Sequence, residues 1–349
     1  MERDASRFFF WILVAGSGAA CVSVLVACAV GPAPLSLNEA ARALAGFLGI
    51  SHTEVSRTAL VVVGEMRLPR ALLALFCGAG LGMAGAVFQG LLHNPLADPF
   101  TLGVSGGAAF GASLALTLGL PPFFSVAGIP LSALSLCALA GALASLGAVL
   151  FLGRVGGGWR RETLILAGVV VSSFLSALIS LVKSLNEESV AGIVFWIMGS
   201  FQGRGWEELG LFFPWWVAGC AVMSAGSREL DILLLGDAQA GQLGVRVTRV
   251  RLTLLTAASL MTGACVSVAG IIGFVGLIVP HLVRLVLGTV HARLLPVSAL
   301  CGGVLLLWAD MLARTLLSGG AELPVGVITA MLGGPFFCLA LTRRGRMGS

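Results

Sequence analysis

Few side chains in this sequence could do covalent chemistry or hold a metal. The histidines show no HExxH or other zinc-ligand spacing, and the eight cysteines lie in apolar runs without a CxxC pair. A phosphate-binding loop requires a lysine after glycine, but the one lysine, Lys183, follows Val182. We therefore expect no metal or cofactor on this chain, and any energy taken from ATP would have to come from another polypeptide.

One serine could act as a nucleophile. The segment Gly103-Val104-Ser105-Gly106 matches the GxSG pattern of rhomboid-type intramembrane proteases, and His281 is a conceivable base. A pattern of four residues arises easily in a chain with 48 glycines. A rhomboid-like protease is therefore kept as an alternative, which a Ser105→Ala variant would separate from a function without catalysis.

A second group of polar side chains forms a hydroxyl stripe. Serines recur every four residues at Ser172, Ser176, Ser180 and Ser184, which places them on one face of a helix. Such a stripe could line a weakly polar conduit. It could equally return hydrogen bonds to backbone carbonyls of its own helix.

The elements that position these side chains are membrane helices. Of 349 residues, 58% are hydrophobic and 11% are charged, and the mean hydropathy is +1.01, whereas soluble domains carry about 25% charged residues. The apolar runs are about as long as a membrane-spanning helix and do not alternate as barrel strands do. We predict an all-α membrane protein with about ten spans, roughly at residues 8–30, 69–92, 101–119, 129–152, 163–183, 208–226, 252–270, 272–288, 294–313 and 325–342.

The basic residues predict the orientation. With the N-terminus inside, fourteen basic residues face the cytoplasm and seven face outward, which favours an inner-membrane, multi-pass protein with both termini cytoplasmic. The net charge of +5 then reflects cytoplasmic arginines, and nucleic-acid binding is not expected. Residues 31–66 form a periplasmic segment, in which 38–48 is patterned as an amphipathic surface helix.

The N-terminus also allows a different interpretation. Leu25-Val26-Ala27-Cys28 is like a lipoprotein cleavage box and follows an apolar run. That run is longer than an ordinary signal sequence and many further spans follow it. We therefore expect residues 8–30 to be the first span.

Several segments occur in a specific order. Here the chain resembles the permeases of ATP-binding-cassette (ABC) importers for iron-siderophores, haem and cobalamin, and the resemblance covers residues 60–342. The combination is specific, although each piece alone is weak. The segments are Arg67-Leu68-Pro69-Arg70, Phe88 to Pro99, Leu102 to Gly107, Phe195 to Ser200, Gly270 to His281, and Glu322-Leu323-Pro324-Val325-Gly326.

The resemblance implies one transmembrane permease domain over 1–349 with the type II importer fold. Its parts are a first span at 8–30, a periplasmic segment at 31–66, the remaining spans within 67–342, and a cytoplasmic coupling loop at 227–251. Implied partners are a second copy in a homodimer, two ABC ATPase subunits, a periplasmic or lipid-anchored substrate-binding protein, and the lipid bilayer. The translocation pathway would follow the dimer axis, lined by the helix that carries the serine stripe.

The resemblance also assigns roles to individual residues. Arg67, Arg70 and Arg314 match arginines that contact acidic residues of the binding protein, and anchoring to lipid headgroups is the alternative. Asp310, four residues before Arg314, could hold that arginine in place. The segment from Leu233 to Gly244 is similar to a coupling helix that seats in the ATPase, and an ordinary polar loop is the alternative. The residues expected to contact the ATPase are Gly236, Ala238, Ala240, Gly241, Leu243 and Gly244.

The substrate is the least determined feature. Iron-siderophore, haem and cobalamin importers share these motifs, so we expect an iron chelate with a corrinoid as the alternative. A secondary carrier driven by an ion gradient would also lack an ATPase site. Such carriers place ionisable groups at mid-membrane, whereas His281 and Asp310 lie near the ends of the predicted spans.

Overall fold

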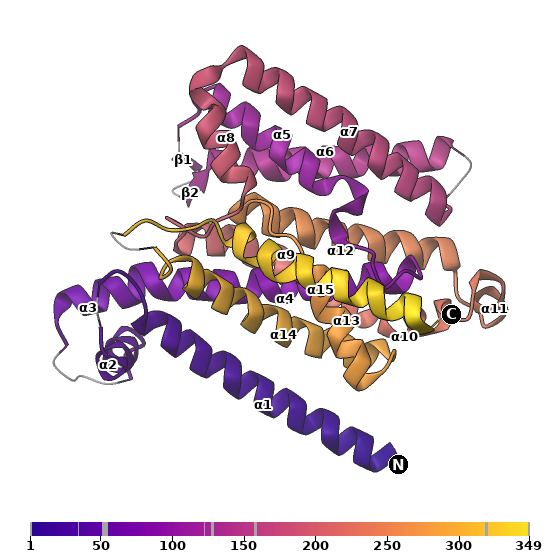
Figure 1. Ribbon diagram of the computed structural model, residues 1–349, viewed down its shortest axis with the longest axis horizontal. Coiled ribbons are helices and arrows are strands. Elements are labelled where there is room, and N and C mark those ends of the chain that lie inside the picture. The colour runs from indigo at the N-terminus through magenta and orange to yellow at the C-terminus, as the bar shows by residue number, and fades with distance from the viewer. Residues whose placement is uncertain are drawn as a thin grey trace.

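The structure is a computed structural model of the 349-residue chain. Most of the chain is helical, and the helices lie in a tilted bundle (Figure 1). The residues that the structure describes are 2–33, 35–50, 55–121, 123–126, 129–156, 159–317 and 320–347.

Long apolar helices build the bundle, as predicted. In the described ranges, seven helices are long and apolar enough to cross a membrane, and three shorter apolar helices (α5, α13 and α15) accompany them. Together they occupy the ten predicted spans. The ten are α1 (Glu2–Ala29), α4 (Leu68–Leu91), α5 (Val104–Thr117), α6 (Ala133–Val155), α7 (Arg161–Leu185), α9 (Trp206–Ala225), α12 (Val247–Ala269), α13 (Val275–Leu287), α14 (His291–Ala313) and α15 (Val325–Met347).

Short elements connect these helices. They are helices of 3 to 11 residues and one two-stranded antiparallel hairpin. They are α2 (Leu37–Phe47), α3 (Arg57–Val61), the π-helical turn η1 (Val62–Arg67), the 3₁₀ turns η2 (Pro99–Leu102) and η3 (Glu187–Ser189), β1 (Phe123–Val126), β2 (Ile129–Ser132), α8 (Val190–Ile197), α10 (Ser227–Leu233) and α11 (Asp237–Gln242).

Two predicted boundaries are wrong. The span expected from residue 129 begins as strand β2, and its helix α6 starts only after Ser132, whose side chain caps it by accepting from Ser135 N–H. Pro130 in this stretch lacks the N–H that a helix requires. The second span also starts earlier than expected, because α3 and η1 continue into α4 as one run over 57–91. The predicted surface helix at 38–48 is confirmed as a helix by α2, which begins with a Ser36–Glu39 capping box.

Helix α4 lies at the centre and packs tightly on α14. A Cβ atom added to Gly78 would lie 2.2 Å from the carbonyl oxygen of Gly302, and one added to Gly82 would lie 2.4 Å from that of Ser298. Small residues at this spacing let two helix backbones approach closely, which is how packing holds helices together in lipid. The backbones of α4 and α14 therefore lie in direct contact.

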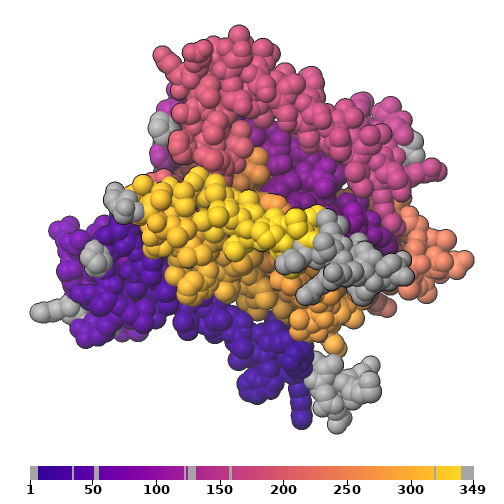
Figure 2. Space-filling view, in the orientation of Figure 1, coloured from indigo at the N-terminus to yellow at the C-terminus, as the bar shows by residue number. Residues whose placement is uncertain are grey.

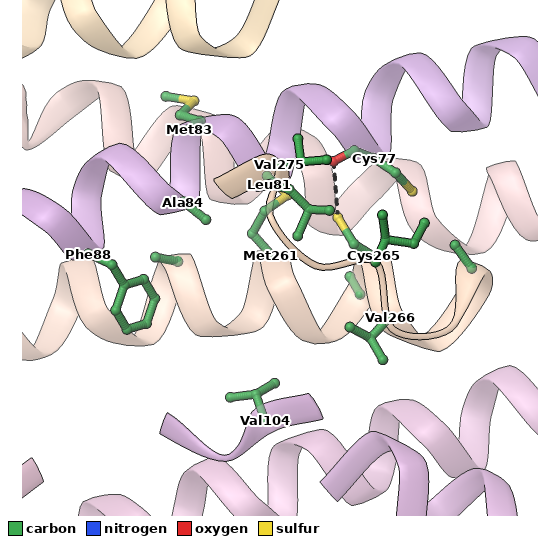
Figure 3. Packing of buried hydrophobic residues seen from close by; sticks show 14 of the residues in the cluster. Cys77, Leu81, Met83, Ala84, Phe88, Val104, Met261, Cys265, Val266 and Val275 are labelled. Atoms are coloured by element: carbon green, nitrogen blue, oxygen red, sulfur yellow. Dashed lines mark hydrogen bonds between the residues drawn. The ribbon is translucent and has the colours of Figure 1, made fainter. Parts of the chain in front are cut away.

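The other side of α4 packs on α12. Figure 3 shows Leu81 of α4 beside Met261 and Cys265 of α12, and the Cys265 thiol lies 3.6 Å from the carbonyl oxygen of Cys77. The eight cysteines are free thiols, and Cys28 lies buried in the continuous helix α1. The cysteines thus pack as small apolar residues, as their sequence surroundings predict.

The bundle has two distinct ends. Helix α1 begins and α15 ends on the side where α10 and α11 lie, and α2, α3 and the β1–β2 hairpin lie on the opposite side (Figure 1). In the space-filling view α15 lies at the surface, with α7 on one side and α14 on the other (Figure 2). We call the side where α4 begins and α14 ends the arginine end, because Arg67, Arg70 and Arg314 lie there, and the other side the α11 end.

Candidate docking and coupling sites

At the arginine end, Arg67 ties the end of α1 to the start of α4. Its Nη1 donates hydrogen bonds to the carbonyl oxygens of Cys28 at 3.0 Å and Ala29 at 2.7 Å, and its Nη2 donates to that of Ala33. The last carbonyls of a helix lack partners within the helix and carry partial negative charge. The guanidinium therefore caps α1, and Arg67 is only 5% exposed.

Arg70 joins three parts of the chain through two carboxylates. Its Nη2 lies 2.7 Å from Asp310 Oδ1 and its Nε contacts both oxygens of Asp310. The same guanidinium donates from Nη1 and Nη2 to the two oxygens of Glu322 at 3.1 and 2.8 Å. Paired hydrogen bonds between charged groups of this kind are strong and fix orientation. Arg70 thus links α4 to α14 and to the segment that leads into α15.

Arg314 is the least satisfied of the three arginines. Its Nη2 lies 3.6 Å from Asp310 Oδ2, so the predicted Asp310–Arg314 pair exists, but the shorter contacts of Asp310 go to Arg70. Among the described residues, Arg314 Nε and Nη2 meet no hydrogen-bond acceptor, although the residue is only 5% exposed. Burying N–H groups without an acceptor is costly, so an anion that reached Arg314 would relieve that cost.

A cavity of about 430 Å³ brings the three predicted arginines together. Arg204 also lines it and pairs with Glu208 at 3.4 Å, and two acidic residues, Glu65 and Glu322, lie in its wall. Spacing along the chain does not reveal Glu322 or Arg204, since both lie far from α4 in sequence. The only available signal is that Glu322 stands beside the Leu-Pro-Val-Gly segment of the predicted motif.

The α11 end is built differently. Gly236 and Gly244 have φ angles of +106° and +85°, which suit glycine, and they bracket the six-residue helix α11. Asp237, its first residue, accepts a hydrogen bond from Arg251 Nη2 at 2.6 Å and lies 3.8 Å from Arg161. The hydrogen bond from Arg251 lowers the pKa of Asp237. These contacts fix the start of α11 against α12 and α7.

Most predicted coupling residues lie on the surface. Ala238, Gly241, Leu243 and Gly244 are exposed, Leu243 by 61%, and nothing lies within 4 Å of a Cβ added at Gly241. Ala240 differs from the prediction, because it is fully buried against its own chain. A helix of six residues has one inner face, and Ala240 occupies it. Ala240 therefore anchors α11, and the remaining residues form the outer surface.

Two further contacts, which the sequence did not reveal, join the α11 region to the central helices. Asp231 Oδ1 accepts from the backbone N–H of His291 at 2.9 Å and contacts its Nδ1 at 2.6 Å. His93, just after α4, contacts the carbonyl oxygen of Leu233 through Nε2 at 2.9 Å. Desolvation, and then Arg161, lower the pKa of His93. Helices α4 and α14 are therefore tied to α10 at this end.

The serine stripe lies on the outer side of α7. Ser176, Ser180 and Ser184 are exposed, whereas Ser172 is half-buried, with its Oγ 3.1 Å from a Cβ added at Gly103. Ser180 Oγ donates to the carbonyl oxygen of Ser176 at 3.0 Å. Ser180 thus returns a hydrogen bond to its own helix, as the second alternative expects, and the lining of a conduit by this exposed face stays a prediction.

Metal-ligand side chains do not gather in groups of three or more within the described ranges. The two ends instead carry partly buried ion pairs at one side and an exposed helix of small residues at the other. Such features suit contacts with other proteins.

The sequence profile of the FecCD transport family matches residues 19–343. This chain belongs to that family. It is accordingly a multi-pass membrane permease subunit of an ABC importer, and a permease subunit is not itself an enzyme. The family match begins at residue 19, within α1, and includes Cys28.

Several relatives match this chain over nearly its whole length. The cobalamin import permease BtuC of Halobacterium salinarum is 40% identical over 376 aligned positions, covering 99% of each chain. The Fe(3+) dicitrate permease FecC of Escherichia coli is 39% identical over 318, covering 89% of this chain and 90% of FecC. A metal-chelate type ABC transporter solved in an inward-facing conformation matches with a TM-score of 0.81 and 32% identity, covering 95% of this chain and 99% of that one.

Proposed function

We propose that this FecCD permease moves a metal chelate, with an iron chelate as the first candidate, across the inner membrane. Both of its termini would lie in the cytoplasm. The observation that carries the proposal is the near full-length match to a metal-chelate type ABC transporter at a TM-score of 0.81. FecC supports iron as the metal. The 99% coverage of the cobalamin permease supports a corrinoid as the second candidate.

The coupling role belongs to the outer surface of α11. Gly236, Ala238, Gly241, Leu243 and Gly244 would seat in a cleft of a separate ATPase, which binds ATP and Mg²⁺. Exposed Leu243, together with small residues that leave open space, favours close contact with a protein surface. The ties from Asp231 to His291 and from His93 to Leu233 would pass movement of this region to α14 and α4.

The docking role belongs to the arginine end. There a substrate-binding protein would present acidic residues to the cavity lined by Arg67, Arg70 and Arg314. The three arginines would not contribute equally. Arg314 has N–H groups to offer, Arg70 is occupied by carboxylates, and Arg67 is used by carbonyls of α1.

A second copy of the chain would complete the pathway. The exposed stripe of Ser176, Ser180 and Ser184, with Ser172 beside it, is polar on an otherwise apolar helix, and lipid contact would leave its hydroxyls poorly solvated. We expect this face to line a conduit between two copies. Weakly polar walls would allow a chelate to pass without being held.

Uptake by cells tests the substrate. A strain that lacks this protein would be given ⁵⁵Fe-citrate, a ⁵⁵Fe-hydroxamate siderophore or ⁵⁷Co-cobalamin in metal-limited medium, with and without the restored gene. Gene-dependent uptake of an iron chelate supports the first assignment, and gene-dependent uptake of cobalt alone moves the substrate to a corrinoid. Uptake of neither label removes the substrate assignment.

The energy source is tested in the same cells. Arsenate depletes ATP and should stop uptake, whereas a protonophore given under ATP-replete conditions should leave most of it. The reverse pattern would favour the secondary carrier. A Ser105→Ala variant should transport normally, and its failure while still folded would reopen the protease alternative.

A further inference from the structure

The two carboxylates on Arg70 are held very differently. Asp310 lies inside helix α14, its side chain is 1% exposed, and it also faces Arg314. Glu322 lies outside the helices, in the segment between α14 and α15, and its side chain is 10% exposed in the wall of the 430 Å³ cavity. One partner is therefore fixed by its helix, and the other stands at the cavity surface.

Glu322 uses the donors that a docking partner would need. It takes Arg70 Nη1 and Nη2 with both carboxylate oxygens, the same fork that an acidic residue from another protein would form. Asp310 takes Nε and shares Nη2. An incoming carboxylate can therefore pair with Arg70 only if Glu322 leaves.

The charges around Arg70 are balanced before any partner arrives. Arg70 and Arg314 carry two positive charges and Asp310 and Glu322 carry two negative charges, all within one connected set. A docking carboxylate would add a negative charge to a partly buried, neutral cluster, which is unfavourable unless one carboxylate moves into water. Glu322 can do so, because it already borders the cavity.

We propose that Glu322 is an internal competitor at the docking surface. The Glu322 carboxylate accepts the two Arg70 hydrogen bonds that an acidic residue of the substrate-binding protein would accept. On docking, that acidic residue replaces Glu322 on Arg70. The inference rests on the proposed docking role of the arginine end. It makes Glu322 a residue that limits the affinity of docking, and it makes Asp310 the fixed partner that keeps Arg70 in position.

The test compares three charge-neutral variants of the full transporter in lipid nanodiscs. Binding of the purified substrate-binding protein encoded with this gene is measured by biolayer interferometry for Glu322→Gln, Asp310→Asn and Glu65→Gln. Glu65 is the matched control, because it lines the same cavity and its loss changes the charge equally. We expect Glu322→Gln to bind about tenfold more tightly, the factor that corresponds to about 1.4 kcal/mol. Asp310→Asn should show no gain.

Each other result overturns the inference. If Glu322→Gln binds equally or more weakly, Glu322 is only a structural partner of Arg70. If Glu322→Gln and Glu65→Gln tighten binding equally, the effect is one of net charge. Modification of Arg70 by phenylglyoxal, followed by mass spectrometry, provides a readout without the partner and should be faster in Glu322→Gln.

A fourth variant separates this inference from the docking proposal. Arg314→Glu should weaken binding whether or not Glu322 competes, because it removes the available N–H groups. If Arg314→Glu weakens binding but Glu322→Gln does not strengthen it, docking stands and the competition fails. If Arg314→Glu leaves binding unchanged, the docking proposal itself is wrong.

Discussion

The arginine end and the α11 end use opposite means to meet a partner. At the arginine end, two of the three arginines predicted for docking already bond within the chain, Arg67 to carbonyls and Arg70 to two carboxylates. At the α11 end, Gly241 and Leu243 are exposed, with open space around Gly241. A partner at the first end must compete with contacts inside the chain, whereas a partner at the second needs only a complementary shape.

This contrast explains why the two ends should respond differently to mutation. Charges that hold helices together affect folding when one of them is removed. Exposed glycines and alanines affect folding little. The predictions below run from the largest expected change in the free energy of unfolding to the smallest.

Removing Asp310 should destabilise the chain most. Asp310→Ala leaves Arg70 with Glu322 alone and removes the carboxylate that lies 3.6 Å from Arg314. Breaking a buried ion pair in this way costs about 3 to 5 kcal/mol. Thermal unfolding of the purified chain in detergent should show a clearly lower Tm. Glu65→Ala, which removes an exposed carboxylate from the cavity at the arginine end, is the control and should unfold near the wild-type temperature. Equal Tm values for both variants would contradict a structural role for Asp310.

Asp98, in the loop after α4, should make stability depend on pH. Burial raises its pKa to about 6, although its Oδ1 accepts a hydrogen bond from Phe100 N–H at 2.8 Å. A carboxyl group whose pKa is raised on folding stabilises the protein fully below its unfolded pKa of about 4. This stabilisation, about 1 to 3 kcal/mol, is lost as the pH rises through the folded pKa. Asp98→Asn should flatten the profile of Tm between pH 4 and pH 7.

Asp237 provides a comparison of opposite sign. Arg251 lowers its pKa, so its contribution is present above a pH of about 4 and is lost as the pH falls further. The Asp237→Asn variant should therefore lose stability at neutral pH but not in acid. For Asp98, the contradicting result would be a Tm of the Asp98→Asn variant that still falls between pH 4 and pH 7 as it does in the wild type.

Ala240 separates the inner face of α11 from its outer face. Ala240→Leu places three extra carbon atoms in a fully buried position, and such overpacking costs about 1 to 3 kcal/mol. Ala238→Leu adds the same atoms on the exposed side and should change stability by less than about 0.5 kcal/mol. Both are measured as Tm in detergent. If the two variants behave alike, α11 is not anchored through Ala240.

Local features of the sequence predicted much of this fold. Long apolar runs located the helices, and the spacing of four residues predicted the pair of Asp310 and Arg314. The start of the 57–91 helical run was missed because Glu65 and Arg67 interrupt its apolar pattern. The strand at 129–132 was missed because its residues are as apolar as a membrane helix.

Contacts between distant segments could not be predicted. Arg70 and Glu322 are 252 positions apart, and their pairing depends on how α4 and α14 pack through Gly78 and Gly302. The burial of Ala240 was equally hidden, because a helix of six residues is too short for its apolar period to reveal an inner face. The sequence thus indicated which arginines and which loop matter, but not which groups are already occupied.

The most direct test of the account is iron-chelate uptake by cells that carry Gly241→Arg as the only copy of this protein. Because the arginine side chain enters open space, the free energy of unfolding should change by less than about 0.5 kcal/mol, and Tm should stay near that of the wild type. The Gly241→Ala control should transport normally. We predict a folded Gly241→Arg protein in the membrane at wild-type amounts and no ATP-dependent uptake. Uptake at the wild-type rate would contradict the assignment of α11 as the surface through which ATP hydrolysis drives this permease.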